Sequence, residues 1–300
     1  MTPLSPALRA LIHAGTPAIL VRVARALGST PREAGAAMIV TRETSAGTVG
    51  GGALEMAGTL RARAMLVNGE ASDRLAIPLG PAIGQCCGGH VTLTLQRLDA
   101  ALLAAEIDAE NEAAAHRPTV LIFGAGHTGR ALAQALQPLP LRLCTIDVRN
   151  AALADWPAGF ETRVTPLPEA EAATAPPGSA FLVMTHDHAL DFLISAAALG
   201  RGDAAYVGMI GSATKREKFR RYLVEAGEGH LIAGLTLPIG GGRVRDKRPE
   251  VIAALTAAEL VEALLSKAEE KLGSGFSTGT SQCNSALTEP QPKARNARAS

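Results

Sequence analysis

The stretch TVLIFGAGHTGRALA constrains the fold of this chain more than any other feature. An apolar run ends in Gly124, Gly126 and Gly129, which form the pattern G-x-G-x-x-G, and a helical pattern follows from His127. In such a turn the first glycine permits the tight bend, the second lets a pyrophosphate approach the backbone, and the third allows close packing of helix on strand. The start of the helix would present free N–H groups to an anion. Asp147 ends the next apolar run, about 20 residues further on, where an acid that binds a ribose is expected.

Strand-like and helix-like segments alternate over residues 118–272, which predicts a parallel sheet covered by helices on both faces. Four apolar runs indicate strands, TVLIFGAG, LRLCTIDVR, SAFLVMTHD and AAYVGMIG, and a last long helix is expected over residues 249–272. The predicted fold class is therefore α/β, with a Rossmann-like parallel sheet in the C-terminal domain. A fold does not fix its ligand, so nucleotide binding in this domain stays an open question.

Residues 1–98 follow a different pattern and predict a smaller α+β domain at the N-terminus. A helix candidate leads into the strand-like run AILVRVARAL, a second helix begins at GGGALE, and RLAIPLG and HVTLTLQRL indicate strands. Residues 99–117 predict a linker helix with Asp99 as its N-cap. The last stretch, residues 273–300, is rich in Ser, Thr, Gly, Asn and Pro without an apolar period, and we expect a disordered tail there.

Composition argues against several classes of function. Lys plus Arg is 29 and Asp plus Glu is 28, so the formal charge of +1 lacks the strongly basic footprint of a nucleic-acid-binding domain. No apolar run approaches the roughly 20 residues of a membrane span. The first residues lack the basic start and long apolar block of a signal peptide. We therefore expect a cytoplasmic protein that binds neither nucleic acid nor a membrane.

Two neighbouring cysteines, Cys86 and Cys87, lie in the glycine-rich stretch LGPAIGQCCGGH. No second cysteine pair or suitable histidine pair follows, which argues against a structural zinc site. A thiolate prefers soft metals and sulfur-rich centres, and a glycine loop lets it reach a bulky ligand. The loop, with Gln85 and Gly88 beside the thiols, is therefore a candidate for holding a metal cofactor by one sulfur. Cys144 lies in an apolar run, and we expect it to be buried.

A second glycine-rich turn, Gly50, Gly51 and Gly52, precedes a helix and offers backbone N–H groups together with the helix dipole. Two further segments follow predicted strands and would face one crevice at the carboxyl edge of the parallel sheet. They contain His186, Asp187 and His188, and Gly208, Gly211, Ser212, Lys215 and Arg216. A purely structural role is equally open for each: the glycines turn the chain, an acid caps a helix, and the basic and histidine side chains face solvent. A metal site at the histidines is the weaker alternative.

Six ordered stretches, GSTPREAGAAMIV, GTVGGGALE, GQCCGGHVTL, IFGAGHTGRALA, VMTHDHALD and YVGMIGSATKREKF, strongly resemble the XdhC/CoxI family over residues 8–270. The resemblance implies a protein that binds the molybdenum cofactor, a molybdenum held by the dithiolene of a phosphorylated pterin (molybdopterin). Such proteins hold the cofactor while a NifS-type cysteine desulfurase replaces one oxo ligand by sulfido, and then promote its insertion into apo xanthine dehydrogenase. The resemblance thus implies an accessory protein rather than an enzyme, and a homodimer.

Carried onto this chain, the resemblance makes Cys86 or Cys87 the candidate molybdenum contact. It makes the turns Gly50–Gly52 and Gly124–Gly129 candidates for binding the pterin phosphate or an attached nucleotide. The stretch PIGGGRVRDKRPEVIAAL is more basic than its counterpart in the family.

The alternative to a cofactor chaperone is an NAD(P)-dependent oxidoreductase, which the glycine pattern and Asp147 favour. In that case His186 or His188 would serve as the acid or base. A third interpretation has the Rossmann-like domain mainly docking partner proteins.

Overall fold

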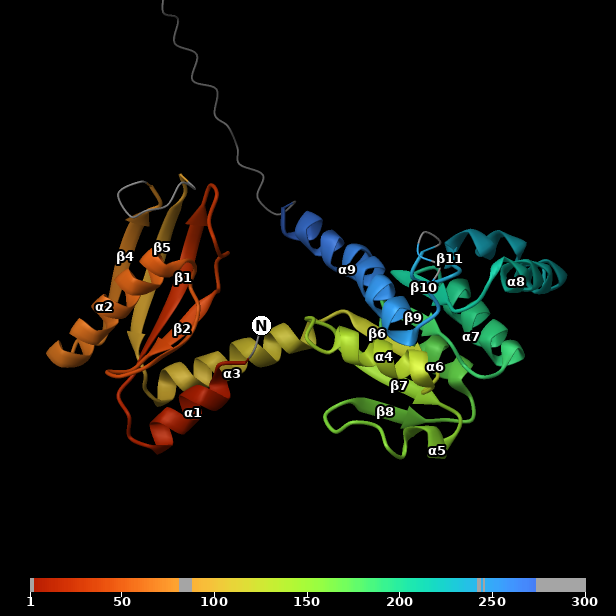
Figure 1. Cartoon of the computed structure of the whole chain (residues 1–300), viewed down its shortest axis with the longest axis horizontal. Coiled ribbons are helices and arrows are strands. Elements are labelled where there is room, and N and C mark those ends of the chain that lie inside the picture. The colour runs from red at the N-terminus through yellow and green to blue at the C-terminus, as the bar shows by residue number, and fades with distance from the viewer. Residues whose placement is uncertain (1–2, 81–87, 242–243, 245, 274–300) are drawn as a thin grey trace, which may run out of the picture. The chain divides into compact units, whose positions relative to one another are not determined.

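The computed structural model of the chain describes residues 3–80, 88–241, 244 and 246–273. The chain divides into two compact units (Figure 1). The first comprises the chain up to residue 120 together with residues 136–143, and the second comprises residues 121–135 together with the chain from residue 144 onward. Among the described residues, none of the helices is long and apolar enough to cross a bilayer.

The first unit is built on a five-stranded antiparallel sheet. In chain order its elements are α1 (Ser5–His13), β1 (Ile19–Leu27), β2 (Ala37–Val40), β3 (Ser45–Gly47), α2 (Gly52–Asn68), β4 (Ser72–Pro78), β5 (His90–Arg97) and α3 (Ala100–Ala115). The strand order is β3-β2-β1-β5-β4, and every pair is antiparallel. This unit is the smaller α+β region that the sequence predicts.

Alternating side chains of β1 give the first sheet two apolar faces, because successive residues of a strand point to opposite sides. Ile19, Val21 and Val23 pack with the buried side chains of α2 on one face. Leu20 belongs to the cluster on the other face, which α1 and α3 cover (Figure 1).

Glu110 of α3 ties α3 to the start of α1. Its carboxylate accepts hydrogen bonds from the backbone N–H groups of Leu4 (2.6 Å) and Ser5 (3.0 Å) and from the Ser5 hydroxyl. Asp99 caps α3 by accepting the N–H of Leu102 at 2.7 Å, which confirms the predicted N-cap. The predicted linker helix is therefore packed onto the first unit.

The second unit is built on a six-stranded parallel sheet. In chain order its elements are β6 (Thr119–Phe123), α4 (His127–Leu136), β7 (Arg142–Asp147), α5 (Asn150–Leu153), β8 (Glu161–Val164), α6 (Pro168–Thr174), β9 (Ala180–Val183), α7 (His188–Gly200), β10 (Tyr206–Met209), α8 (Ala213–Glu225), the 3-10 helix η2 (Gly229–Gly234), β11 (Leu235–Thr236) and α9 (Pro249–Gly273). The fully buried rings of Phe123, Phe181 and Phe219 lie in its core.

The strand order of the second sheet is β11-β10-β9-β6-β7-β8. Successive strands are added on one side of β6 up to β8 and on its other side from β9 onward, so the order reverses between β6 and β9. Numbered from β6, this is the order 3-2-1-4-5-6 of dinucleotide-binding sheets, in which ligands bind outside the carboxyl ends of the strands near the reversal. The predicted α/β class with a Rossmann-like sheet is confirmed. The glycine turn after β6 and the segment after β9 flank the reversal point.

The two edges of this sheet carry different side chains. At one edge the Arg216 guanidinium, from α8, donates hydrogen bonds to the carbonyls of Leu235 (3.0 Å), Leu237 (3.3 Å) and Ile232 (3.4 Å) around β11. At the other edge all residues of β8 are exposed, and its Arg163 pairs with acidic neighbours.

Candidate functional site

Three glycine-containing segments of the first unit meet beyond one end of its sheet. Ser29 forms a bridge with Gly88, and a Cβ placed on Gly89 would lie 2.3 Å from the Ser29 carbonyl oxygen. A Cβ on Gly50 would lie 2.8 Å from Cγ of Pro31. The short turn that contains Ser29 and Pro31 therefore contacts both the stem of the cysteine loop and the turn before α2.

The start of α2 is built to leave backbone N–H groups open. Gly50 has a φ of +141°, which favours glycine, and Gly51 at the N-cap has no side chain that could cap the helix. A Cβ on Gly52 would have no described atom within 4 Å. Thr48 holds the turn by hydrogen bonding Glu55, which is the acidic residue of the first helical turn.

The predicted thiol site falls mostly outside the described residues. Gln85, Cys86 and Cys87 belong to the stretch 81–87, so their role stays a prediction. The stems of this loop are described: the N–H of Leu79 donates to the carbonyl of Gly89 at 2.7 Å.

In the turn after β6, Gly124 and Gly129 have the packing roles that the sequence pattern predicts, and ligand binding at Gly126 stays a prediction. Gly124 has a φ of +116°, and a Cβ there would lie 2.3 Å from the carbonyl oxygen of Met184. A Cβ on Gly129 would lie 1.9 Å from the carbonyl oxygen of Gly124, so only glycine permits this contact of helix and strand. A Cβ on Gly126 would meet no described atom within 4 Å, which leaves the turn open to a ligand. His127 is exposed at the first position of α4.

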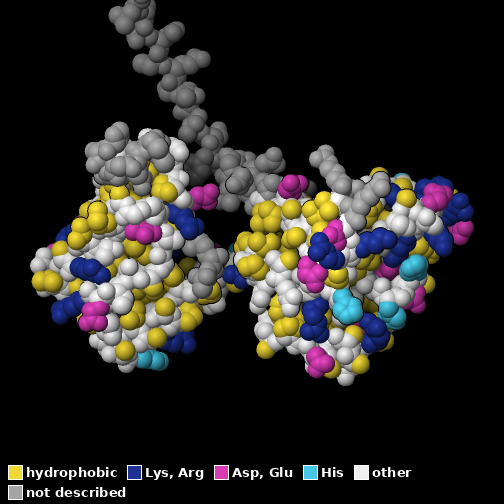
Figure 2. Space-filling model, viewed as in Figure 1, with side chains coloured by type: hydrophobic (Ala, Val, Ile, Leu, Met, Phe, Trp, Pro, Cys, Tyr) yellow, Lys and Arg dark blue, Asp and Glu magenta, His cyan; other side chains and the backbone are white. Residues whose placement is uncertain are grey.

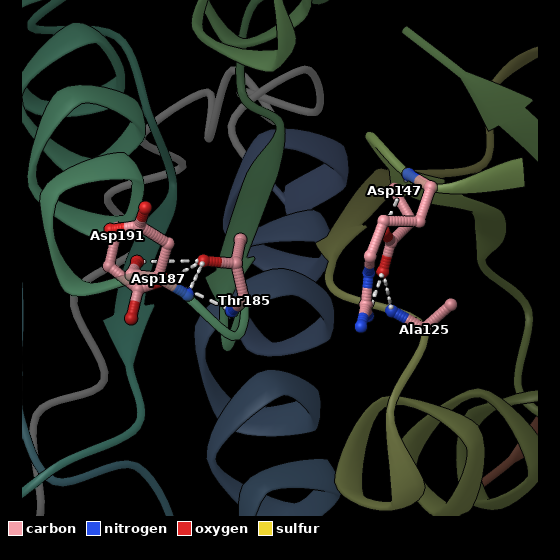
Figure 3. Close-up of polar contacts among 6 residues, drawn as sticks. Ala125, Asp147, Thr185, Asp187 and Asp191 are labelled. Carbon is pink, nitrogen blue, oxygen red and sulfur yellow. Dashed lines mark hydrogen bonds and ion pairs between the residues drawn. The ribbon is translucent and has the colours of Figure 1, made fainter. Parts of the chain in front are cut away.

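Asp147 at the end of β7 is buried and already engaged by protein groups (Figure 3). One carboxylate oxygen accepts the N–H (2.9 Å) and Nε (3.0 Å) of Arg149; the other accepts Nη2 of Arg149 (3.0 Å) and the N–H of Ala125 (2.8 Å). Burial alone would raise the pKa of this carboxyl, but the hydrogen bonds from Arg149 and Ala125 outweigh it and hold the pKa below its ordinary value. A ribose that binds to Asp147 must therefore displace Arg149.

A second polar cluster joins the segments that follow β9 and β10. Figure 3 shows its members from the segment after β9, Thr185, Asp187 and Asp191. Asp191 is fully buried, and one of its oxygens accepts the N–H (2.9 Å) and the hydroxyl (2.7 Å) of Thr185. Its other oxygen pairs with Nζ of Lys215 at 2.5 Å, and Lys215 also donates to the carbonyl of Ile210 at 3.0 Å. Asp187 caps α7 by accepting the N–H of Ala189 at 2.7 Å.

A cleft of about 510 Å³ opens beyond the carboxyl ends of the strands of the second sheet. Side chains from the starts of α4, α7, α8 and α9 line it, among them Thr128, Thr185, His186, His188, Ser212, Lys215, Lys247 and Ile252. Figure 2 shows histidine side chains beside Lys and Arg side chains on the surface of the second unit. In the described part of the chain no cluster of three His, Cys, Asp or Glu residues suits a metal ion.

The cleft brings together part of the predicted set and adds residues that sequence reasoning did not single out. His186, His188, Gly211, Ser212 and Lys215 line it as expected. Arg216 does not line it, because its guanidinium is bound to backbone carbonyls, and Gly208 instead packs against side chains of Tyr206 and Ile239. Thr185 and Lys247 also line it and were not predicted, and neither was the buried Asp191 that pairs with Lys215. The signal available for Asp191 was its position one helical turn after the capping Asp187.

Comparison with known proteins identifies the family. A family model described as "XdhC and CoxI family" matches residues 11–76, and one described as "XdhC Rossmann domain" matches residues 120–260. A curated relative, the uncharacterized protein YqeB of Escherichia coli K12, is 27% identical over 260 residues, which cover 82% of this chain. The chain spans only 43% of the length of that relative.

A solved structure described as a xanthine dehydrogenase from Bacillus halodurans shares the fold, with a TM-score of 0.71 at 19% identity. The match covers 88% of this chain and 96% of the other. The two family models together match most of both units, and the stretch GQCCGGHVTL lies between the two matched ranges. The chain belongs to the XdhC and CoxI family.

Proposed function

We propose that the protein is an accessory protein of xanthine dehydrogenase that binds the molybdenum cofactor. It holds the cofactor while a NifS-type cysteine desulfurase supplies the sulfido ligand, and it then promotes insertion into the apo enzyme. In this proposal the chain is a carrier and performs no catalytic step of its own. Family membership supports the accessory role, and the name of the Bacillus halodurans relative points to the same enzyme.

The observation that carries the proposal is the meeting of the Ser29–Pro31 turn with two glycine segments. Pro31 contacts the turn before α2, while Ser29 bridges to Gly88 at the stem of the cysteine loop. A phosphate on the open amides at Gly52 would therefore be close to Gly88, the residue that directly follows Cys87. Backbone N–H groups at the start of a 17-residue helix suit a phosphate, and thiolates suit molybdenum.

The chain's own residues would then divide the work of holding the cargo. The amides of Gly51 and Gly52 bind and orient the phosphate of the pterin. One thiolate of Cys86 or Cys87 contacts the metal, which when bound supplies the site at which oxo is exchanged for sulfido. Glu55 already places one negative charge in the first turn of α2, so its carboxylate disfavours ligands that carry more negative charge than the phosphate.

The test is retention of molybdenum and pterin by the full chain after incubation with the cofactor and removal of unbound ligand. Wild type should retain both, and the Cys86→Ala/Cys87→Ala double variant should lose them while its circular dichroism spectrum stays unchanged. Cys283→Ala is the matched control, because it removes a thiol and leaves the vicinal pair intact. Equal retention by wild type and the double variant would refute the thiolate contact.

A second pair of variants separates the two glycine turns. Gly52→Ala and Gly126→Ala both add a methyl group where no described atom lies within 4 Å, so both proteins should fold. If the phosphate binds at α2, only Gly52→Ala should weaken retention. The opposite pattern would move the phosphate to the second unit.

An NAD(P)-dependent oxidoreductase is the alternative that the strand order and glycine turn of the second unit favour. The engagement of Asp147 by Arg149 counts against it, since the ribose acid is already occupied. Saturable binding of NAD(H) or NADP(H) that Gly126→Ala abolishes would support this alternative. Sedimentation of the full chain tests the expected homodimer.

A further inference from the structure

The cleft at the carboxyl edge of the second sheet has the features of an anion site at the start of α8. We propose that it binds the phosphate or carboxylate group of a small molecule between Ser212, Lys215 and Lys247. The proposed contacts lie at the start of α8, whereas the glycine turn leads into α4, whose Thr128 lines the same cleft. The site does not depend on the proposed binding of molybdenum cofactor by the first unit. A cleft of about 510 Å³ falls in the size range of small-molecule sites.

Four helices contribute residues at or next to their starts to the lining of this cleft: Thr128, His188, Ser212 and Lys247. Each helix start carries a positive partial charge and N–H groups without partners in the helix. At α7 these groups are bound by the Asp187 carboxylate. At α8 the N-cap Ser212 makes no side-chain hydrogen bond to the described helix, so an outside acceptor has room there.

Lys215 lies in the first turn of α8, beside this open helix start. Its side chain is only 9% exposed, yet it lines the cleft. An ammonium group has three donors. Two of them bind Asp191 and the carbonyl of Ile210, and the third has no acceptor among the described residues. An anionic oxygen in the cleft can accept this third N–H, and such a charge-assisted hydrogen bond is stronger than a neutral one.

The remaining charges around the cleft favour an anion. Asp187 is used in capping α7, and both oxygens of Asp191 are occupied by Thr185 and Lys215. Lys247 is exposed at the cleft and makes no ion pair within the part of the chain that the structure describes. The acidic groups are thus neutralised by their partners, while one lysine and one helix start are left to act on a ligand.

The two possible sources of the anionic oxygens are distinguished by the probe. Inorganic phosphate and acetate are titrated separately into the full chain in a buffer free of other oxyanions, by calorimetry and by the shift in melting temperature. Saturable binding of phosphate alone assigns the site to a phosphate ester, and saturable binding of acetate assigns it to a carboxylate. If neither phosphate nor acetate binds saturably at concentrations up to about 10 mM, the proposal is overturned.

Two variants that should change the affinity for the anion in opposite directions locate the site. Lys247→Ala should weaken binding about tenfold, the loss expected for one charge-assisted contact. Asp191→Asn should strengthen it severalfold, because Lys215 loses its counter-ion while the amide oxygen still accepts from Thr185. Lys218→Ala is the control, since this exposed lysine of α8 does not line the cleft, and it should bind as wild type does.

Two results would overturn the location of the site even if an anion binds. The first is unchanged affinity in Lys247→Ala, whose exposed side chain is not needed for folding. The second is loss of binding in Gly126→Ala with full binding in Lys247→Ala, which would put the anion on the glycine turn. Neither result bears on cofactor retention by the first unit, so failure here and failure of the proposed function are distinguishable.

Discussion

Replacing Asp147 by Asn removes a buried charge that joins the glycine turn to the end of β7. Each carboxylate oxygen accepts two hydrogen bonds, and Asn turns one of these oxygens into a donor. Whichever way the amide is oriented, two bonds are lost and the other two lose their ionic character. Hydrogen bonds to charged groups contribute about 1.5–3 kcal/mol each, and the partly exposed Arg149 recovers hydration in the variant. We therefore expect the free energy of unfolding at pH 7 to fall by about 2–3 kcal/mol.

The assay is urea unfolding followed by the fluorescence of Trp156, the single tryptophan, which lies in the second unit. Because the native pKa of Asp147 lies below its ordinary value, its contribution is present above the unfolded pKa of about 4 and is lost as pH falls through the native pKa. The difference between wild type and Asp147→Asn should thus be constant from about pH 8 to 5 and shrink below about pH 4.

Glu217→Gln is the matched control, because Glu217 pairs with Arg220 and Arg221 on the exposed face of α8, where ion pairs contribute little. Its unfolding midpoint should stay at that of wild type. Equal midpoints for Asp147→Asn and wild type at pH 7 would refute the inference that this carboxylate stabilises the turn. A difference that persists undiminished at about pH 3 would mean that its charge is not the cause.

Three further predictions concern other parts of the fold. Gly129→Ala should lower the free energy of unfolding by about 3 kcal/mol or more, because its methyl group would overlap the Gly124 carbonyl, whereas Gly126→Ala should cost less than about 1 kcal/mol; urea unfolding compares the two. Cys144 should resist Ellman's reagent at pH 8 in the native protein and react in urea, because burial raises the pKa of its thiol to about 11; peptide mass spectrometry measures its labelling. Glu110→Ala should speed hydrogen exchange at the start of α1, where three donors lose their acceptor, without affecting exchange in the second sheet.

The parallel sheet could be predicted where its strands are fully buried, and not where they lie at an edge. β6 and β9 are continuous apolar runs because helices cover both of their faces. β8 has the sequence ETRV with every residue exposed, so it carries no apolar signal. β11 consists of two residues, and its pairing depends on β10 rather than on its own composition.

The glycines of the candidate site could be predicted from the sequence, whereas the pairing of its charged side chains could not. A tight backbone approach such as that at Gly129 leaves a direct mark on the sequence, since only one residue type fits. The pair of Asp191 and Lys215 joins residues 24 positions apart on two helices, and no local pattern announces it. Asp147 was predicted as a ribose ligand from its spacing; its partner Arg149, only two residues away, shows how a local ion pair can occupy such an acid.

The arginine bound to the carbonyls around β11 also bears on how the second unit avoids association with other chains. An edge strand with free backbone groups is a template for pairing with another polypeptide. Arg216 occupies three carbonyls at one edge, and the charged side chains of Glu161 and Arg163 make the opposite edge a poor partner for an apolar strand. Each edge strand is thereby a poor template for a further strand, because side chains rather than another layer of backbone occupy it, so the sheet can end after six strands.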